Sequence, residues 1–307
     1  MKTGIVIKST GSWYSVLFDE EKVLECNIRG KFRLNGIRLT NPVSVGDVVD
    51  VDISKNGNVI TNIHKRRNYI IRKSVNLSKE AHIIASNVDL AMLIVTVRHP
   101  KTPTIFMDRF LVMAEAYGIP AVLVFNKVDL YDEDDRAISG GLKIIYERIG
   151  YKCVEASATT GEGTEDVKVL LKDKMTVLSG MSGVGKSTLV NYIEPELNLK
   201  TNIISISHDS GKHTTTFAEM YNLEEGGYII DTPGMRSYGI IGIKREEVSH
   251  YFPEIFTESK NCKFNNCTHT HEPGCAVIDA VNDGRISETR YISYLNIVNE
   301  VNDKYRK

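Results

Sequence analysis

The chain has 307 residues, of which 42% are apolar and 25% charged, and its formal net charge is −1. This length predicts two or three domains, and the composition is ordinary for a soluble globular protein. The first residues lack the apolar core of a signal peptide, and the longest apolar run, near Leu90–Val97, is far too short to cross a bilayer. We therefore expect a cytoplasmic protein that does not associate with membranes.

Charge is distributed unevenly along the chain. Residues 1–73 hold 13 Lys/Arg against 7 Asp/Glu, whereas the middle of the chain is acidic. A basic N-terminal module on an acidic body indicates a polyanionic partner bound at that end. An ordinary solvated surface is the alternative interpretation of the same charge pattern.

Residues 1–65 are expected to form a small β-barrel. Short segments that alternate apolar and polar residues are separated by turns rich in Gly, Asn and Pro; they are Ile5–Lys8, Trp13–Phe18, Val23–Phe32, Asp47–Asp52 and Val59–Ile63. Five such strands suit a closed barrel of the OB type, although an SH3-like barrel has much the same pattern. We expect Trp13 in the barrel core, with stacking on nucleic-acid bases as the alternative.

From about residue 86, predicted strands alternate with predicted helices. The strands are Val88–Val97, Ala121–Phe125, Lys152–Ala156, Met175–Leu178 and Tyr228–Ile230. The helices are Phe106–Tyr117, a segment from Ile138 to Ile149, one capped by Thr164 that runs to about Lys172, and one that starts at Lys186. This alternation predicts a parallel sheet with helices on both faces. After about residue 240 the sequence is typical of helices, with one Cys-rich insertion.

The strongest motif is a phosphate-binding loop of the form G-x-x-x-x-G-K-[ST]. It consists of Gly180, Met181, Ser182, Gly183, Val184, Gly185, Lys186, Ser187 and Thr188. A predicted strand precedes the loop and a predicted helix follows it, so backbone N–H groups and the helix N-terminus can cradle phosphates. We predict that Lys186 reaches the β- and γ-phosphates and that the Ser187 hydroxyl ligates Mg²⁺.

A second motif indicates that the base is guanine. Asn126, Lys127, Val128 and Asp129 follow a predicted buried strand and resemble the NKxD motif of GTPases. A carboxylate at Asp129 can accept two hydrogen bonds from the guanine N1–H and exocyclic amine, a pair that adenine does not offer. Ser157 and Ala158 end another strand and resemble the supporting motif whose backbone N–H meets the guanine oxygen.

Two further segments resemble elements that sense the γ-phosphate. Asp231-Thr232-Pro233-Gly234 resembles DxxG, in which Asp231 would support Mg²⁺ through water and the Gly234 N–H would meet the γ-phosphate. Residues 211–216 resemble a first switch segment, whose threonine would complete the Mg²⁺ shell. The resemblance favours Thr215, with Thr214 and Thr216 as alternatives.

The order of these motifs is itself informative. In ordinary GTPases the phosphate loop comes first, whereas here the guanine motif and Ser157-Ala158 precede it. One circular permutation of the same sheet explains this order. Because both switch segments then directly precede the C-terminal region, the γ-phosphate can act on that region.

A possible metal site lies near the C-terminus. Three of the five cysteines fall between residues 262 and 275, which in a chain without an export signal favours a metal over disulfides. Cys262, Cys267, His269 and Cys275 have the spacing C-x4-C-x-H-x5-C, and three thiolates with one imidazole form a closed tetrahedral zinc set. His271 is the alternative to His269.

Taken together, these motifs resemble the circularly permuted ribosome-assembly GTPases of the RsgA/YjeQ/YloQ family over essentially the whole chain. The resemblance implies an OB-type, RNA-binding β-barrel in residues 1–67, a circularly permuted α/β P-loop GTPase domain with a mostly parallel sheet in 68–240, and a helical zinc-binding domain in 241–307. It also implies a monomeric GTP phosphohydrolase that uses GTP, GDP, Mg²⁺ and one Zn²⁺. Such a protein would assist late maturation of the small ribosomal subunit, contact its rRNA and be stimulated by it.

The chain departs from ordinary GTPases after the DxxG element. Met235 occupies the position where many carry the Gln that orients the attacking water, which methionine cannot do. The resemblance points to His213 as the catalytic residue besides Lys186, and we hypothesise that His213 orients the water once the ribosome orders its loop. A loop histidine without a catalytic role is the alternative.

Two other classes of protein would share part of this pattern. A P-loop small-molecule kinase would need an acceptor-binding lid and no guanine motif. A non-enzymatic RNA-binding module would use GTP only as a folding ligand. For RNA binding, the candidate contacts are Arg29, Lys31, Arg33 and the Lys65–Arg67 run, with Trp13 or Tyr14 as stacking residues.

Overall fold

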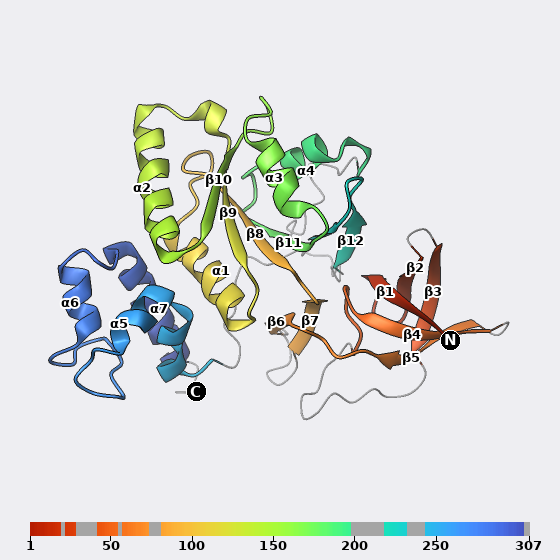
Figure 1. The fold of residues 1–307 in the computed structure, drawn as a ribbon, viewed down its shortest axis with the longest axis horizontal. Helices are drawn as coiled ribbons and strands as arrows, with labels where there is room; N and C mark the ends of the chain where they lie inside the picture. The colour runs from red at the N-terminus through yellow and green to blue at the C-terminus, as the bar shows by residue number, and fades with distance from the viewer. Residues whose placement is uncertain are drawn as a thin grey trace.

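The computed structural model describes residues 1–19, 22–28, 42–54, 57–73, 81–197, 218–231 and 243–303. Figure 1 shows an N-terminal β-barrel, a central sheet flanked by helices, and a cluster of C-terminal helices that packs beside α1. This arrangement confirms the predicted fold class of barrel, permuted α/β domain and helical C-terminal region. Within the described residues, none of the helices has the length and apolar composition needed to span a membrane.

The barrel consists of β1 (Lys2–Ser9), β2 (Tyr14–Phe18), β3 (Lys22–Ile28), β4 (Val48–Ser54) and β5 (Gly57–Ile63). β1 pairs antiparallel with both β2 and β4, and β5 lies between β3 and β4, so the strands close on themselves in the order β1-β2-β3-β5-β4. Alternate residues of each strand point inward and form a buried core that includes Val16, Phe18, Val51 and Ile60. The closed barrel of five strands is OB-like, as expected.

The expectation that Trp13 belongs to the barrel core is wrong. Its side chain is 52% exposed in the turn between β1 and β2, whereas the next residue, Tyr14, is buried. Tyr14, Val16 and Phe18 share the inward face of β2, and the period of two along a strand leaves the preceding aromatic outside. Tyr14, like Phe18, is therefore a core aromatic residue, and of Trp13 and Tyr14 only Trp13 is accessible for stacking.

The central sheet contains β8 (Leu90–Val95), β9 (Ala121–Asn126), β10 (Lys152–Ala156), β11 (Met175–Ser179), β12 (Glu219–Asn222) and β13 (Tyr228–Asp231). Their order is β10-β9-β8-β11-β13-β12, and all neighbours are parallel except β12 and β13. The antiparallel strand β12, which also pairs with β1 of the barrel through Lys8 and Glu219, was not predicted, because its sequence, Glu-Met-Tyr-Asn, has no apolar run. The mostly parallel sheet itself was predicted.

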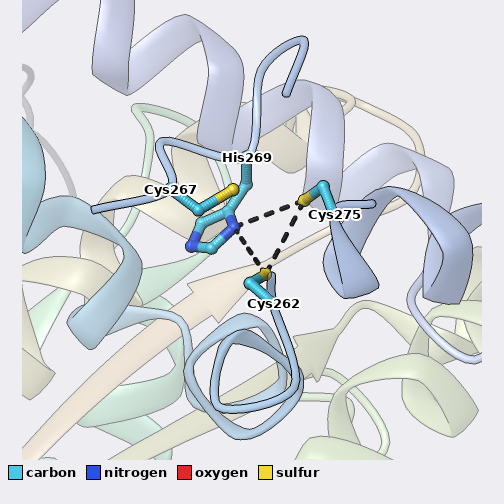
Figure 2. A group of neighbouring side chains, drawn as sticks. All are labelled: Cys262, Cys267, His269 and Cys275. Atoms are coloured by element: carbon cyan, nitrogen blue, oxygen red, sulfur yellow. Dashed lines mark hydrogen bonds between the residues drawn. The ribbon is translucent and has the colours of Figure 1, made fainter. Parts of the chain in front are cut away.

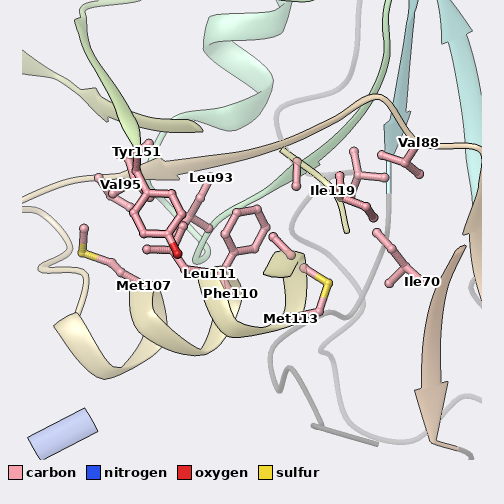
Figure 3. Close-up of a cluster of buried hydrophobic side chains, with 14 of the residues drawn as sticks. Ile70, Val88, Leu93, Val95, Met107, Phe110, Leu111, Met113, Ile119 and Tyr151 are labelled. Atoms are coloured by element: carbon pink, nitrogen blue, oxygen red, sulfur yellow. The ribbon is translucent and has the colours of Figure 1, made fainter. Parts of the chain in front are cut away.

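Helices cover both faces of this sheet. α1 (Thr104–Ala116) and α2 (Glu133–Ile149) pack on one face, and α3 (Thr164–Leu171) and α4 (Lys186–Ile193) pack on the other. Leu93 and Val95 of β8 face Phe110 of α1 (Figure 3), whereas Met92 and Ile94 belong to the opposite cluster. Burial on both faces explains the unbroken apolar run of β8. Thr164 is the first helical residue of α3 rather than its cap, which is Gly163.

A buried ion pair fixes the junction between the barrel and the two-stranded sheet that precedes the central sheet. The Arg66 guanidinium donates from Nε to Asp47 Oδ1 and from Nη2 to Asp47 Oδ2, both at 2.6 Å, and Ser86 Oγ donates to Asp47 at 2.6 Å. Ser86 ends β7 (Ala81–Ser86), which forms a two-stranded sheet with β6 (Tyr69–Lys73). Arg66 is therefore engaged within the protein, which contradicts its assignment as an RNA contact; Arg67 pairs with Asp89 but stays exposed.

The C-terminal region comprises α5 (Pro253–Ser259), α6 (Ala276–Asn282) and α7 (Glu288–Asp303). Short 3₁₀ segments occur at Val128–Leu130, Pro195–Leu197 and Arg245–Tyr251. Phe252, Ile255, Tyr294 and Ile297 form the centre of a separate core, to which α1 contributes Val112. Helix α1 thus has one side in the core of the central sheet and the other in the core of the C-terminal region.

Candidate nucleotide site and metal centre

The phosphate loop adopts a backbone that only glycine accommodates at two points. Gly180 has φ +148°, and a Cβ there would lie 2.5 Å from the Ile94 carbonyl oxygen. Gly185 has φ +92°, and its Cβ would lie 2.5 Å from Asn126 Nδ2. The Lys186 ammonium donates to the carbonyl oxygens of Gly180 and Met181, each at 2.8 Å, so it is held over the loop it belongs to. The loop joins β11 to α4, the context in which such loops bind phosphate.

The guanine motif and the phosphate loop are joined by hydrogen bonds. Asn126 Nδ2 donates to the Val184 carbonyl at 2.8 Å, and Lys127 Nζ donates to the Gly183 carbonyl at 2.6 Å. Asn126 ends β9, which is separated from β11 only by β8. Segments more than 50 residues apart in the sequence therefore form one continuous rim at the carboxyl ends of the parallel strands, where ligands bind in such sheets.

The Asp129 carboxylate is oriented by Ser157. Ser157 Oγ donates to Asp129 Oδ1 at 2.6 Å and accepts from the backbone N–H groups of Thr159 and Thr160 at 3.2 and 3.1 Å. Ser157 is fully buried at the end of β10, whereas Asp129 is exposed. A rigid neighbour thus aims an accessible carboxylate, which can then accept a pair of hydrogen bonds from a guanine edge.

Tyr131 supports the candidate base site but belongs to none of the sequence motifs. Its hydroxyl donates to the Asn126 carbonyl at 3.0 Å and accepts from the Val97 N–H at 3.3 Å, so it ties the end of β8 to the guanine motif. Burial raises the pKa of Tyr131 to about 12. The phenol therefore remains protonated and keeps donating at physiological pH. Its position five residues after Asn126 lies outside the guanine motif, so the sequence carried no signal for this role.

The switch residues fall largely outside the described chain. His213, Thr215, Gly234 and Met235 lie in segments that the structure does not describe, and their assigned roles stay predictions. The backbone of Asp231 ends β13, where it is paired in register with Leu178 of β11. That register places the start of the DxxG element at the same sheet edge as the phosphate loop. Ser187, the proposed Mg²⁺ ligand, is buried in the first turn of α4.

The four predicted metal ligands converge in the C-terminal region (Figure 2). The donor atoms of Cys262, Cys267, His269 and Cys275 all lie within 4.8 Å of one another. His269 Nδ1 is 3.5 Å from the sulfurs of both Cys262 and Cys275, and those two sulfurs are 3.9 Å apart. The alternative ligand His271 is exposed, and its Nδ1 contacts the Thr270 hydroxyl instead.

These distances fit a tetrahedral zinc ion. Bonds of about 2.3 Å to sulfur and about 2.0 Å to nitrogen separate two sulfurs by about 3.8 Å, and a sulfur from a nitrogen by about 3.5 Å. Burial and the neighbouring thiols raise the pKa of Cys267 to about 12, so this thiol stays protonated unless a cation replaces its proton. Tyr291 and Tyr294 of α7 donate to the carbonyls of His269 and Thr268, at 2.8 and 2.7 Å, and so hold the loop on the helix.

The fold and the joined motifs define a circularly permuted P-loop GTPase, and comparison with known proteins identifies the family. The family profile described as RsgA GTPase matches residues 63–241, and the RsgA N-terminal domain profile matches residues 3–60. The chain belongs to the RsgA GTPase family. GTP hydrolysis is the activity of this class, which binds guanine nucleotides with Mg²⁺.

Full-length relatives agree with this assignment. The chain is 54% identical to the small ribosomal subunit biogenesis GTPase RsgA of Flavobacterium psychrophilum, with 99% of this chain and 94% of the relative covered. It is also 54% identical to the protein of that name from Phocaeicola vulgatus, covering 99% and 98%. YjeQ from Thermotoga maritima superposes with a TM-score of 0.78 at 37% identity, covering 98% of both chains. YloQ, described as a circularly permuted GTPase, gives 0.76 at 33% identity, covering 99% and 96%.

Proposed function

We propose that this protein is a GTPase of small-ribosomal-subunit biogenesis, the function named for its relatives. One observation carries the nucleotide assignment: Asn126 and Lys127 reach the phosphate loop while Ser157 aims the Asp129 carboxylate outward. A base read by Asp129 and phosphates held by residues 180–188 then occupy one continuous site. A P-loop small-molecule kinase would not require a carboxylate that reads guanine.

Each residue has a distinct task in the proposed site. Lys186 would leave the loop carbonyls for the β- and γ-phosphates, and Ser187 and Thr215 would hold Mg²⁺, which would supply charge neutralisation at the phosphates. Asp231 would support the ion through water, and the Gly234 N–H would meet the γ-phosphate. Asn126, Lys127, Val128 and Asp129 form the base pocket with Ser157 and Ala158. The remaining loop residues contribute backbone N–H groups.

Substitution of Asp129 tests the base assignment. Asp129→Asn replaces an acceptor by a donor, so the preference should move from guanine towards xanthine nucleotides. Competition binding with GTP, XTP and ATP measures this preference. Wild-type protein that binds ATP as well as GTP would favour the kinase alternative, and an unshifted preference in the variant would remove Asp129 from the base pocket.

His213 is proposed to orient the attacking water. A His213→Ala variant should lose subunit-stimulated turnover while its GTP affinity stays intact, because the side chain acts on the water rather than on the nucleotide. Stimulated turnover equal to that of the wild type would leave His213 as a loop residue without a catalytic role. A Ser187→Ala variant that still supports subunit maturation in cells would favour the non-enzymatic alternative.

The metal centre is proposed to be a structural Zn²⁺ site. Cys262, Cys267, His269 and Cys275 supply four protein ligands, which leaves no open position for substrate. The barrel and the zinc-binding region are proposed to contact rRNA, with Trp13 as an exposed stacking residue in the β1–β2 turn, a loop that binds oligonucleotides in OB folds. We also propose a monomeric, cytoplasmic protein whose domains span 1–67, 68–240 and 241–307.

Subunit binding is measurable directly. Sedimentation with purified small subunits should carry the protein into the pellet, with purified large subunits as the matched control. Binding should weaken as salt rises, because Lys and Arg side chains that contact phosphates release counterions. Equal recovery with both subunits would contradict a specific role in small-subunit biogenesis.

A further inference from the structure

A buried ion pair joins the C-terminal region to the central domain. Arg290 of α7 donates from Nη1 to Asp108 Oδ1 of α1 at 2.8 Å, across 182 residues of sequence. Both side chains are completely buried. Tyr146 of α2 donates to the same carboxylate oxygen at 2.8 Å, and Glu254 of α5 accepts from Arg290 Nε and Nη2 at 2.7 and 3.2 Å. Four helices from two regions therefore meet at one guanidinium.

Such a pair is better suited to fixing an orientation than to adding stability. Taking two charges out of water costs about as much as their attraction returns, so a buried pair is weak evidence for stabilisation. Its fixed hydrogen-bond geometry, however, allows only one arrangement of the groups involved. The Phe252 ring, 4.5 Å from Arg290 Cζ, restricts the guanidinium further. Asp108 and Arg290 thus set how α1 sits against the C-terminal helices.

Helix α1 leads directly into the nucleotide site. The loop of residues 96–103 that precedes α1 is closed by paired hydrogen bonds: the Thr102 N–H donates to the Thr96 carbonyl at 2.8 Å, and the Thr96 N–H donates to Thr102 Oγ1 at 3.1 Å. Within this loop, the His99 carbonyl accepts from Lys127 Nζ at 2.7 Å, the same ammonium that contacts Gly183. A displacement of α1 would therefore move an acceptor of the base-site lysine.

We propose that Asp108 and Arg290 are positioning residues through which the C-terminal region sets the affinity of the base site. The contacts that connect α1 to the nucleotide site end at Lys127, in the guanine motif, and at Gly183, in the phosphate loop. They do not involve the segments assigned to the γ-phosphate. GDP and GTP share the base and the first phosphates. Changes in the pair therefore alter the binding of both nucleotides alike and leave turnover at saturating GTP unchanged. This inference rests on the proposed role of Lys127.

The experiment compares nucleotide release from full-length variants. In Asp108→Asn, the ion pair is lost while Arg290 keeps its two hydrogen bonds to Glu254, so no buried charge is left without a partner. The matched control is Arg109→Gln, because Arg109 pairs with Glu300 and joins the same two helices at a partly exposed position. Release of fluorescent GDP and of a fluorescent non-hydrolysable GTP analogue is followed by stopped flow, and KM and kcat are measured in parallel.

Asp108→Asn should speed release of both nucleotides by about fivefold or more and raise KM, with kcat unchanged, whereas Arg109→Gln should match the wild type. If Asp108→Asn does not fold, Arg290→Lys serves as the second variant with the same expectation, because it keeps a positive charge beside Asp108 and Glu254 but loses the fixed geometry of the guanidinium. Wild-type release rates in a folded variant, an effect on only one nucleotide, or an equal effect in Arg109→Gln would overturn the proposal. Wild-type protein that binds no guanine nucleotide would instead overturn the proposed function.

Discussion

Gly185 of the phosphate loop packs directly against Asn126 of the guanine motif, so a side chain at this position would disturb both motifs. Alanine at this position would have to adopt φ +92°, which costs a residue with a Cβ about 1 to 2 kcal/mol. Its Cβ would also lie 2.5 Å from Asn126 Nδ2, so the amide must leave the Val184 carbonyl, a hydrogen bond of about 1 kcal/mol. Together these costs amount to about 2 to 3 kcal/mol. The variant loop avoids them by leaving this conformation, and nucleotide binding must then restore it, which corresponds to about a 30- to 150-fold loss of guanine-nucleotide affinity.

The assay is a titration of a fluorescent guanine nucleotide with Gly185→Ala, accompanied by thermal unfolding. Gly118→Ala is the matched control, because Gly118 also has a positive φ, +63°, but no described atom lies within 4 Å of its Cβ position after α1. The control should lose about 1 kcal/mol of stability and keep its nucleotide affinity. A Gly185→Ala variant that binds as tightly as the control would refute the dependence of the phosphate loop on Asn126.

Three further predictions concern the metal, the barrel junction and acid stability. Removing the metal with a chelator, or replacing Cys275 by Ser, should lower the melting temperature of the C-terminal region while GTP binding persists; an unchanged melting curve would contradict a structural metal. Arg66→Met leaves buried Asp47 without its charge partner, so the free energy of unfolding in urea should fall by about 3 to 5 kcal/mol. A fall of less than about 1 kcal/mol would show that this pair does not hold the junction. Hydrogen bonds from Asn62, His64 and Thr3 lower the pKa of Asp50 to about 2, so its stabilising effect is present above about pH 4 and is lost as the pH falls towards 2. In Asp50→Asn, the urea midpoint of unfolding should fall less steeply between about pH 4 and about pH 2 than in the wild type. Parallel curves of midpoint against pH for the two proteins would contradict the lowered pKa of Asp50.

Local patterns were sufficient for much of the fold and for the main motifs. The unbroken apolar run of β8 predicted a strand buried on both faces, and helix α4 begins at Lys186 as predicted. Cys262, Cys267, His269 and Cys275 are close in sequence, so their convergence required only one loop to close. Patterns of this kind depend on neighbours in the chain, which is why they can be read without coordinates.

Contacts between distant residues could not be predicted in this way. The positive charge of Arg66 indicated an RNA contact, but in the structure this side chain pairs with Asp47. No sequence pattern indicates that Arg290 pairs with Asp108. Trp13 was misplaced because alternation fixes which residues share a face but not which face is inside. The hydroxyl of Tyr131 acts on backbone groups, whose positions depend on the whole sheet.

GTP turnover with and without purified small ribosomal subunits tests the central claim most directly. We predict that turnover is specific for GTP over ATP and rises when small subunits are added, while large subunits leave it unchanged. Turnover that ignores the identity of the base, or that is the same with and without small subunits, would contradict it.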